Sequence, residues 1–246
     1  MNKNIDIPVI IFCGGNEANI RGFFEPKACI PVDGLPLLYH VIKKYIESGF
    51  SRFILPVGFG AEKITKLVSK ENLALYLGSL SEKISLDVIF TGGQNGTGSR
   101  LLQCLELITN DEEVAISYSD TISDVNLVKA YHSFSGSDYL MQLTAVNQPT
   151  RFKVLGFSIF EDFIRGVSTS PILESNYIAG GYYFVRKQFI LNHLDKIDSI
   201  TLSFEDDMMP SSIANKDVKY YKHDSYWYSI DNLRDIRFIE NKIDKM

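Results

Sequence analysis

The sequence predicts an α/β protein with a Rossmann-like, mixed but mainly parallel sheet flanked by helices. Apolar β-branched segments alternate with segments of helical periodicity, and strands joined through helices pair in parallel by right-handed crossovers. Glycine-rich turns follow two of the expected strands, at 14–15 and 92–98. With 246 residues, 45% of them hydrophobic, and no linker or repeat, we expect a single domain over 1–246 with an excursion around 160–180.

Composition narrows the classes of partner and compartment. The formal net charge is −5 and no basic stripe is visible, so we expect no nucleic-acid partner and only local phosphate binding. The three cysteines, Cys13, Cys29 and Cys104, form no CxxC pair, which fits a reducing cytoplasm and argues against a disulfide framework or a zinc site. No secretory signal or membrane-spanning apolar run is apparent, so we expect a cytoplasmic protein without a membrane partner.

The first expected strand, 8–13, is an apolar β-branched run that ends at Cys13, Gly14 and Gly15. Glycines at such a turn let backbone N–H groups approach a phosphate closely, because no Cβ intrudes. Positive charges follow at Arg21 and Lys27. Strand, glycine turn and cations together indicate a pocket for a nucleoside triphosphate. Taken alone, they are equally compatible with a turn that binds nothing.

The next segments continue the alternation of helix and strand. Asp33-Gly34 is a turn signal, Pro36 suits the first turn of a helix, and Gly49 suits its end. We expect, in order, a helix at 37–45, a strand at 52–58, a helix at 61–69 and a strand at 85–90.

A second glycine-rich loop, 91–100, contains Thr97, Gly98 and Arg100 and leads into an expected helix at 101–108. The N–H groups and positive dipole of a helix N-terminus suit a phosphate or a base carbonyl, although a flexible connection with a Thr or Ser N-cap is an open alternative. A strand at 113–118 then ends at Ser119 and Asp120. A carboxylate at the end of a central strand lies where ligands bind, so Asp120 could hold a divalent cation; a turn or capping role is the alternative.

In the second half we expect a helix at 124–134 and strands at 139–146 and 154–160. Between these strands, Arg151 and Lys153 lie beside a proline turn, where they could hold the phosphate of a second substrate or simply be solvated. Residues 163–175 lack a pattern and predict a loop over the sheet.

The pattern resumes with a strand at 177–185, whose Ala179-Gly180-Gly181 predicts a bulge or the close approach of a ligand. Helices at 189–194 and 204–214, a strand at 218–221 and a terminal helix from Leu233 follow. Asp231 lies at the last strand-to-helix junction, where a helix N-cap is the alternative to a metal ligand.

Together these segments resemble the sugar-nucleotidyltransferase family, and within it the glucose-1-phosphate cytidylyltransferase branch. The likeness spans most of the chain, and the order and spacing of the motifs make it specific. The segments that carry it are Phe12-Cys13-Gly14-Gly15, Glu25-Pro26-Lys27, Leu38-Tyr39-His40, Thr97-Gly98-Ser99-Arg100, Tyr118-Ser119-Asp120-Thr121-Ile122-Ser123-Asp124-Val125-Asn126, Arg151-Phe152, Ala179-Gly180-Gly181 and Tyr226-Trp227-Tyr228-Ser229-Ile230-Asp231-Asn232-Leu233-Arg234-Asp235.

The sequence also departs from the family pattern. A shortened loop, 16–21, replaces the family's Gly-Thr-Arg-Leu, and no Glu-Lys-Pro sugar-site element is recognisable between 160 and 178. Ala179 stands where the family has an asparagine able to hydrogen-bond a sugar hydroxyl. The nucleotide half of the site therefore resembles the family, while the acceptor half differs.

The resemblance implies that CTP and a small phosphorylated acceptor give a CDP-linked product and pyrophosphate, for a surface polysaccharide or capsule. It implies that Lys27 stabilises the phosphates in the transition state, with help from Arg21 on the leaving pyrophosphate. Asp120 and Asp231 would bind Mg²⁺, or Mn²⁺ in its place. The implied nucleotide-binding residues are Cys13, Gly14, Gly15, Thr97, Gly98, Arg100 and Ser119, and the implied acceptor-binding residues are Arg151, Lys153, Ala179 and Gly180.

Several alternatives stay open. The acceptor is a sugar-1-phosphate by family default, but a polyol phosphate or phosphoglutamine fits the altered sugar motif. A nucleotide-binding regulatory module without turnover is a candidate of another class. A dinucleotide oxidoreductase has little support, because GxGxxG and an acid after the second strand are both missing. A homo-oligomer is compatible with all of these.

Overall fold

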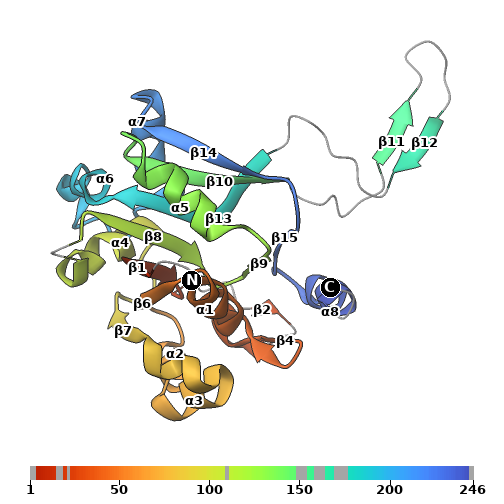
Figure 1. The fold of residues 1–246 in the computed structure, drawn as a ribbon, viewed down its shortest axis with the longest axis horizontal. Coiled ribbons are helices and arrows are strands. Elements are labelled where there is room, and N and C mark those ends of the chain that lie inside the picture. Colours follow the sequence, from red (N-terminus) through yellow and green to blue (C-terminus); the bar gives the residue numbers. More distant parts are fainter. Residues whose placement is uncertain are drawn as a thin grey trace.

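The computed structural model describes residues 4–14, 19–20, 23–108, 111–147, 154–157, 164–168 and 177–243. A seven-stranded sheet runs through the molecule in the order β14-β10-β13-β8-β1-β6-β7 (Figure 1). Its strands are β1 (Ile5–Phe12), β6 (Phe50–Val57), β7 (Ser85–Phe90), β8 (Glu113–Tyr118), β10 (Met141–Asn147), β13 (Tyr177–Arg186) and β14 (Val218–His223).

The sheet is mixed but mainly parallel, as the sequence predicts. Four neighbouring strands, β8, β1, β6 and β7, pair in parallel, and so do β10 and β14. Only β13 runs antiparallel to both of its neighbours within the seven-stranded sheet. The carboxyl ends of β1 and β8 therefore meet at one edge of the sheet, next to each other.

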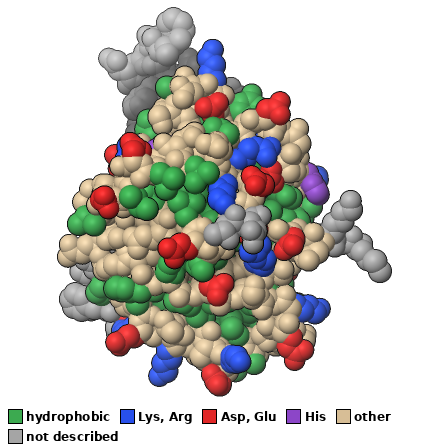
Figure 2. All heavy atoms as spheres, turned by 90° about the vertical axis from the view of Figure 1, so that its left-hand side faces the viewer, with side chains coloured by type: hydrophobic (Ala, Val, Ile, Leu, Met, Phe, Trp, Pro, Cys, Tyr) green, Lys and Arg blue, Asp and Glu red, His purple; other side chains and the backbone are tan. Residues whose placement is uncertain are grey.

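Helices cover both faces of this sheet, because successive side chains of a strand point to opposite faces. Val9 and Ile11 of β1 belong to a core with α1 (Leu37–Glu47), α2 (Ala61–Leu67), α3 (Lys70–Leu77) and α5 (Leu127–Ser135). Ile10 and Phe12 belong to the opposite core, with α4 (Thr97–Gln103), α6 (Lys187–Leu191) and α7 (Met209–Ala214). On the face in Figure 2, acidic and basic side chains are interspersed between small hydrophobic patches.

Short elements complete the region beside the first glycine turn. Strands β4 (Pro31–Val32) and β5 (Leu35–Pro36) form a hairpin whose turn residues, Asp33 and Gly34, both have positive φ. Strand β9 (Thr121–Ser123) pairs with β15 (Trp227–Ser229), and the terminal helix α8 (Leu233–Ile243) follows. A third, small core joins these pieces through Val32, Leu37, Ile230, Ile236 and Ile239. This core holds α8 against the start of α1.

Most expected elements are present with shifted ends, and the expectation for residues 163–175 is wrong. The loop expected at 163–175 contains a strand, β12 (Ile164–Ser168), paired with β11 (Val154–Phe157). This hairpin stands apart from the main sheet in Figure 1. Its ladder is made of backbone hydrogen bonds, which need no apolar alternation, so the sequence pattern did not reveal it. The remaining described strands are β2 (Asn19–Ile20) and β3 (Phe23–Phe24), which pair with each other.

The glycine pair in β13 produces the bulge that the sequence predicts. The register between β10 and β13 shifts opposite Gly180 and Gly181, and Gly181 has a φ of 74°.

Among the described residues, no helix combines the length and apolar character needed to cross a bilayer.

Candidate active site

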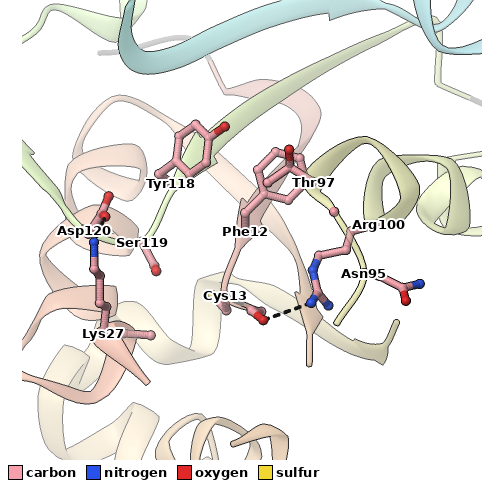
Figure 3. A pocket seen from close by; sticks show the side chains of 12 residues that line it. Phe12, Cys13, Lys27, Asn95, Thr97, Arg100, Tyr118, Ser119 and Asp120 are labelled. Carbon is pink, nitrogen blue, oxygen red and sulfur yellow. Dashed lines mark hydrogen bonds and ion pairs between the residues drawn. The ribbon is translucent and has the colours of Figure 1, made fainter. Parts of the chain in front are cut away.

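A cavity of about 220 Å³ opens at the carboxyl ends of β1 and β8, facing the start of α4 (Figure 3). Seven residues expected in the site from the sequence line it, and five further residues complete its wall. The lining residues are Phe12, Cys13, Gly14, Lys27, Ala28, Asn95, Gly96, Thr97, Arg100, Tyr118, Ser119 and Asp120. The fold thus brings the two glycine-rich loops and the end of β8 around one space.

Lys27 lies between two carboxylates from distant parts of the chain. Its Nζ is 3.3 Å from Asp120 Oδ2 and 3.0 Å from Asp231 Oδ1. Lys27 opens a short 3₁₀ helix, Lys27–Cys29, directly after Pro26. In Figure 3 its side chain extends toward Asp120 along one side of the cavity. The sequence-based expectation that these three residues are close in space is therefore met, while their chemical roles remain predictions.

Backbone contacts hold the two acids beside each other. The amide of Ile230 donates to the carbonyl oxygen of Asp120 over 3.0 Å, which places Asp231 next to the end of β8. The cap of α8 is made by other residues: Asn232 Oδ1 accepts from the amide of Asp235, and Asp235 Oδ2 accepts from the amide of Asn232. This reciprocal cap leaves the Asp231 carboxylate directed at Lys27, so a side-chain capping role does not explain Asp231.

The charges of the three groups depend on one another. Burial raises the pKa of the Asp120 carboxyl and the Lys27 ammonium lowers it, with a net upward shift. Burial lowers the pKa of Lys27, but Asp120 and Asp231 outweigh burial, so the lysine pKa is raised overall. The Asp120 and Lys27 side chains are 19% and 16% exposed, against 48% for Asp231. The ammonium therefore compensates the charge of an acid that would otherwise be costly to bury.

The oxygen donors of Asp120 and Asp231 fit a hard divalent cation. Mg²⁺ binds through one or two protein carboxylates together with waters and substrate phosphates. No group of three or more His, Cys, Asp or Glu side chains with metal-binding geometry occurs in the part of the chain that the structure describes. Two carboxylates alone would leave most positions around such an ion to waters or to substrate phosphate oxygens.

Arg100 forms the opposite side of the cavity and ties three strand ends together. Its guanidinium donates to the carbonyl oxygens of Val57 (3.2 Å) and Gly14 (2.9 Å) and to Thr91 Oγ1 (2.6 Å). Only 2% of Arg100 is exposed, and burial lowers its pKa. A Cβ added to Gly14 would lie 2.2 Å from Arg100 Cζ, so this glycine is required by the guanidinium packed against it.

Helix α4 begins at Thr97, inside the loop expected at 91–100, and two amides at its start are not available to a ligand. The amides of Gly98 and Ser99 both donate to the carbonyl oxygen of Leu202, so neither is free to bind a phosphate. A Cβ on Gly98 would meet Leu202 and Met208 at 2.9 Å, which accounts for this glycine by packing. Thr97 lines the cavity, and its Oγ1 accepts a hydrogen bond from the amide of Phe204. A direct role for Gly98 in nucleotide binding remains only a prediction.

Two aromatic side chains in the cavity wall were missed by the sequence analysis. The rings of Phe12 and Tyr118 lie with their centroids 5.5 Å apart, at the last positions of β1 and β8. Asn95, also missed, donates from Nδ2 to Ser99 Oγ over 3.2 Å. Phe12 and Tyr118 lie at or next to the ends of expected strands, and Asn95 lies in the second glycine-rich loop. These positions are the signal that could have identified them.

The expected acceptor residues lie partly within the described structure. Gly180 is in the bulge of β13, and its carbonyl oxygen accepts from Trp227 Nε1 over 2.7 Å; Ala179, next to it, is exposed. This bond links the bulge to β15, four residues before Asp231. Four expected site residues fall outside the described residues: Gly15, Arg21, Arg151 and Lys153.

No family model matches the sequence. The glucose-1-phosphate cytidylyltransferase of Salmonella typhi is 22% identical over 253 residues, covering 96% of this chain and 95% of the relative.

Solved structures share the fold. HddC from Yersinia pseudotuberculosis superposes with a TM-score of 0.71 at 20% identity, covering 96% of this chain and 99% of that one. The inositol-1-phosphate CTP transferase from T. maritima gives 0.67 at 18% identity, covering 97% and 96%. The sequence likeness runs along almost the whole chain, and the fold is shared with these solved structures: the chain is similar to sugar nucleotidyltransferases in sequence and in fold.

Proposed function

We propose that this protein is a cytidylyltransferase that joins the CMP part of CTP to a small phosphorylated acceptor and releases pyrophosphate. The observation that carries the proposal is the convergence of Lys27, Asp120 and Asp231 at the edge of a cavity formed by two glycine-rich loops. One cation and two carboxylates beside an enclosed space are the groups that phosphoryl-group transfer needs.

CTP is favoured over other nucleotides by the sequence likeness to a glucose-1-phosphate cytidylyltransferase over 96% of the chain. The cavity provides suitable surroundings for a base. The rings of Phe12 and Tyr118 offer apolar contact, and Asn95 and Thr97 offer polar side chains on the facing loop. The three cysteines are free thiols, in keeping with a cytoplasmic enzyme.

The chemistry is attack by an acceptor phosphate oxygen on the α-phosphorus of CTP, in line with the departing pyrophosphate. Lys27 would stabilise the negative charge gathered on the phosphate oxygens in the transition state. Asp120 and Asp231 would hold Mg²⁺, which when bound supplies further charge neutralisation to the phosphates. Arg100 fixes the Gly14 carbonyl, so the first glycine turn keeps the shape that faces the nucleotide. No general base is required, because a phosphate monoester is largely ionised at neutral pH.

The acceptor is a sugar-1-phosphate or another small phosphate such as a polyol phosphate or phosphoglutamine. Ala179 supports the wider choice, because it brings no hydrogen-bonding side chain to a position where the family has asparagine. We place the product in the synthesis of a surface polysaccharide or capsule.

A matrix of nucleotides against acceptors tests this function. CTP, UTP, dTTP and GTP are each incubated with Mg²⁺ and a panel of sugar, polyol and amino-acid-derived phosphates, and pyrophosphate and product mass are measured. We expect a CDP-linked product with at least one acceptor and much lower turnover with the other nucleotides. Tight CTP binding without pyrophosphate release for any acceptor would instead make the protein a regulatory nucleotide-binding module.

A further inference from the structure

The position of the Lys27 ammonium raises a question about how a metal ion enters the site. Nζ lies 3.0 Å and 3.3 Å from one oxygen of each acid, so the lysine occupies the space between Asp231 and Asp120. Both distances are those of charge-assisted contacts or slightly longer. Lys27 thus provides between the two acids the positive charge that a bound cation would also provide.

Lys27 and a divalent ion cannot share this position. Mg²⁺ requires its oxygen ligands at about 2.0–2.1 Å, so an ion bound to both acids would lie within a few ångströms of Nζ. Like charges that close repel strongly, most of all where little solvent screens them, and the Lys27 side chain is only 16% exposed. Either the ion stays away or the ammonium moves.

A bound triphosphate would give the ammonium somewhere to go. Its oxygens are anionic and would lie in the cavity that Lys27 itself lines, so the lysine could exchange carboxylate contacts for phosphate contacts by a side-chain movement. The vacated carboxylates could then receive the ion that accompanies the nucleotide. Positive charge would be present between the acids throughout the exchange.

We propose that Lys27 is the resident counter-ion of Asp120 and Asp231 in the free protein, and that it yields this place to a divalent cation only when a nucleoside triphosphate enters. This inference rests on the proposed function, since it takes the two acids as the metal ligands. It adds an order of events: the free protein binds divalent metal weakly, because its own lysine competes for the site.

Metal binding without nucleotide tests the competition directly. Mn²⁺ is titrated into the free protein and followed by the loss of its free electron-paramagnetic-resonance signal. We expect weak binding by the wild type and binding about tenfold tighter or more in Lys27→Met, which keeps the length of the side chain but not its charge. Lys27→Arg, which keeps the charge, should bind Mn²⁺ as weakly as the wild type.

Two further variants keep the result specific. Lys63→Met removes a lysine that pairs with Glu25 at 3.1 Å on an exposed surface, and should leave Mn²⁺ affinity unchanged. Adding Asp231→Asn to Lys27→Met should abolish the gain, which locates the ion at the proposed acids. Circular dichroism and the melting temperature check that each variant is folded. If Lys27→Met is not folded, Lys27→Gln supplies the uncharged comparison.

The inference is overturned if the wild type binds Mn²⁺ as tightly as Lys27→Met, or if Lys63→Met or Lys27→Arg shows the same gain. The Mn²⁺ titration and the nucleotide–acceptor matrix can succeed or fail independently. A nucleotide–acceptor matrix without product, combined with the expected Mn²⁺ result, would reject the cytidylyltransferase and keep the counter-ion. Product formation with tight Mn²⁺ binding by the free wild type would do the reverse.

Discussion

The carbonyl oxygen of Gly14 accepts a hydrogen bond from Arg100 Nη2 over 2.9 Å, and the guanidinium fills the space that a side chain on Gly14 would need. Gly14 is therefore held by a buried cation from α4, 86 positions along the chain. The lack of a side chain at Gly14 is needed for the packing of Arg100, apart from any ligand. Even the addition of a methyl group at this position should therefore disturb the packing.

Gly14→Ala should destabilise the protein and weaken nucleotide binding together. The new Cβ would lie 2.2 Å from Arg100 Cζ, and relieving such an overlap in a packed site costs about 1–3 kcal/mol. Urea denaturation measures the loss of stability, and CTP titration measures the loss of affinity. Gly93→Ala is the matched control, because a Cβ there meets nothing within 4 Å. Equal stability of the two variants would contradict the role given to Arg100.

Lys27→Ala should leave the fold intact and reduce turnover by about 10³-fold or more, because a positive charge aimed at the phosphates is lost. Water can replace the ammonium beside the half-exposed Asp231, but the largely buried Asp120 loses its compensating charge, so the variant should fold with reduced stability. Initial rates of pyrophosphate release at saturating CTP give the comparison. Turnover like that of the wild type would remove Lys27 from the mechanism.

Asp120→Asn and Asp231→Asn should each raise the Mg²⁺ concentration needed for half-maximal activity. The effect should be larger for Asp120, whose side chain is 19% exposed against 48% for Asp231, because solvent screens the outer acid more. Magnesium titrations of the rate measure this, with Glu62→Gln, a change at an exposed residue of α2, as the control. An unchanged magnesium requirement in both variants would make these acids purely structural.

His40 should make the protein less stable in mild acid. Burial lowers the pKa of its imidazole in the folded state, so the unfolded chain takes up a proton more readily below its ordinary pKa of about 6.5. Stability should therefore be fully present above that value and be lost as the pH falls through the folded-state pKa. Urea denaturation between about pH 7.5 and 5.5 should show a shallower pH slope for His40→Gln than for the wild type. Parallel slopes would contradict the shift.

The sequence predicted the order of strands and helices well where hydrophobic periodicity was strong. Strand β7 and strand β8 have the predicted bounds, because each is a short β-branched run between turn residues. Helix α3 was missed: Leu75 on this helix is 72% exposed, so its apolar residues do not mark one buried face. A strand held mainly by backbone pairing, β12, was likewise invisible to the pattern.

The candidate site was predictable in its residues more than in its connections. Asp120 and Asp231 stood out at strand ends, but capping and metal binding favour the same residue types, so sequence alone left both roles open. Only the structure shows that Asn232 and Asp235 cap α8 and that Lys27 meets both acids. For the Gly98 and Ser99 amides, the sequence suggested phosphate binding, but the structure shows another partner. Both amides donate to the carbonyl oxygen of Leu202, which is more than 100 residues away in the sequence.

The small core that joins Val32 and Leu37 to Ile230, Ile236 and Ile239 is separate from the two large cores that stabilise the sheet. Asp231 therefore takes its position from a terminal segment whose buried apolar contacts are separate from those of the sheet. Proteolysis just after β15 would separate Asp231 and α8 from the rest of the chain. We expect it to abolish activity while the seven-stranded sheet stays folded. Helix α8 thus completes the candidate site while belonging to neither of the two large cores.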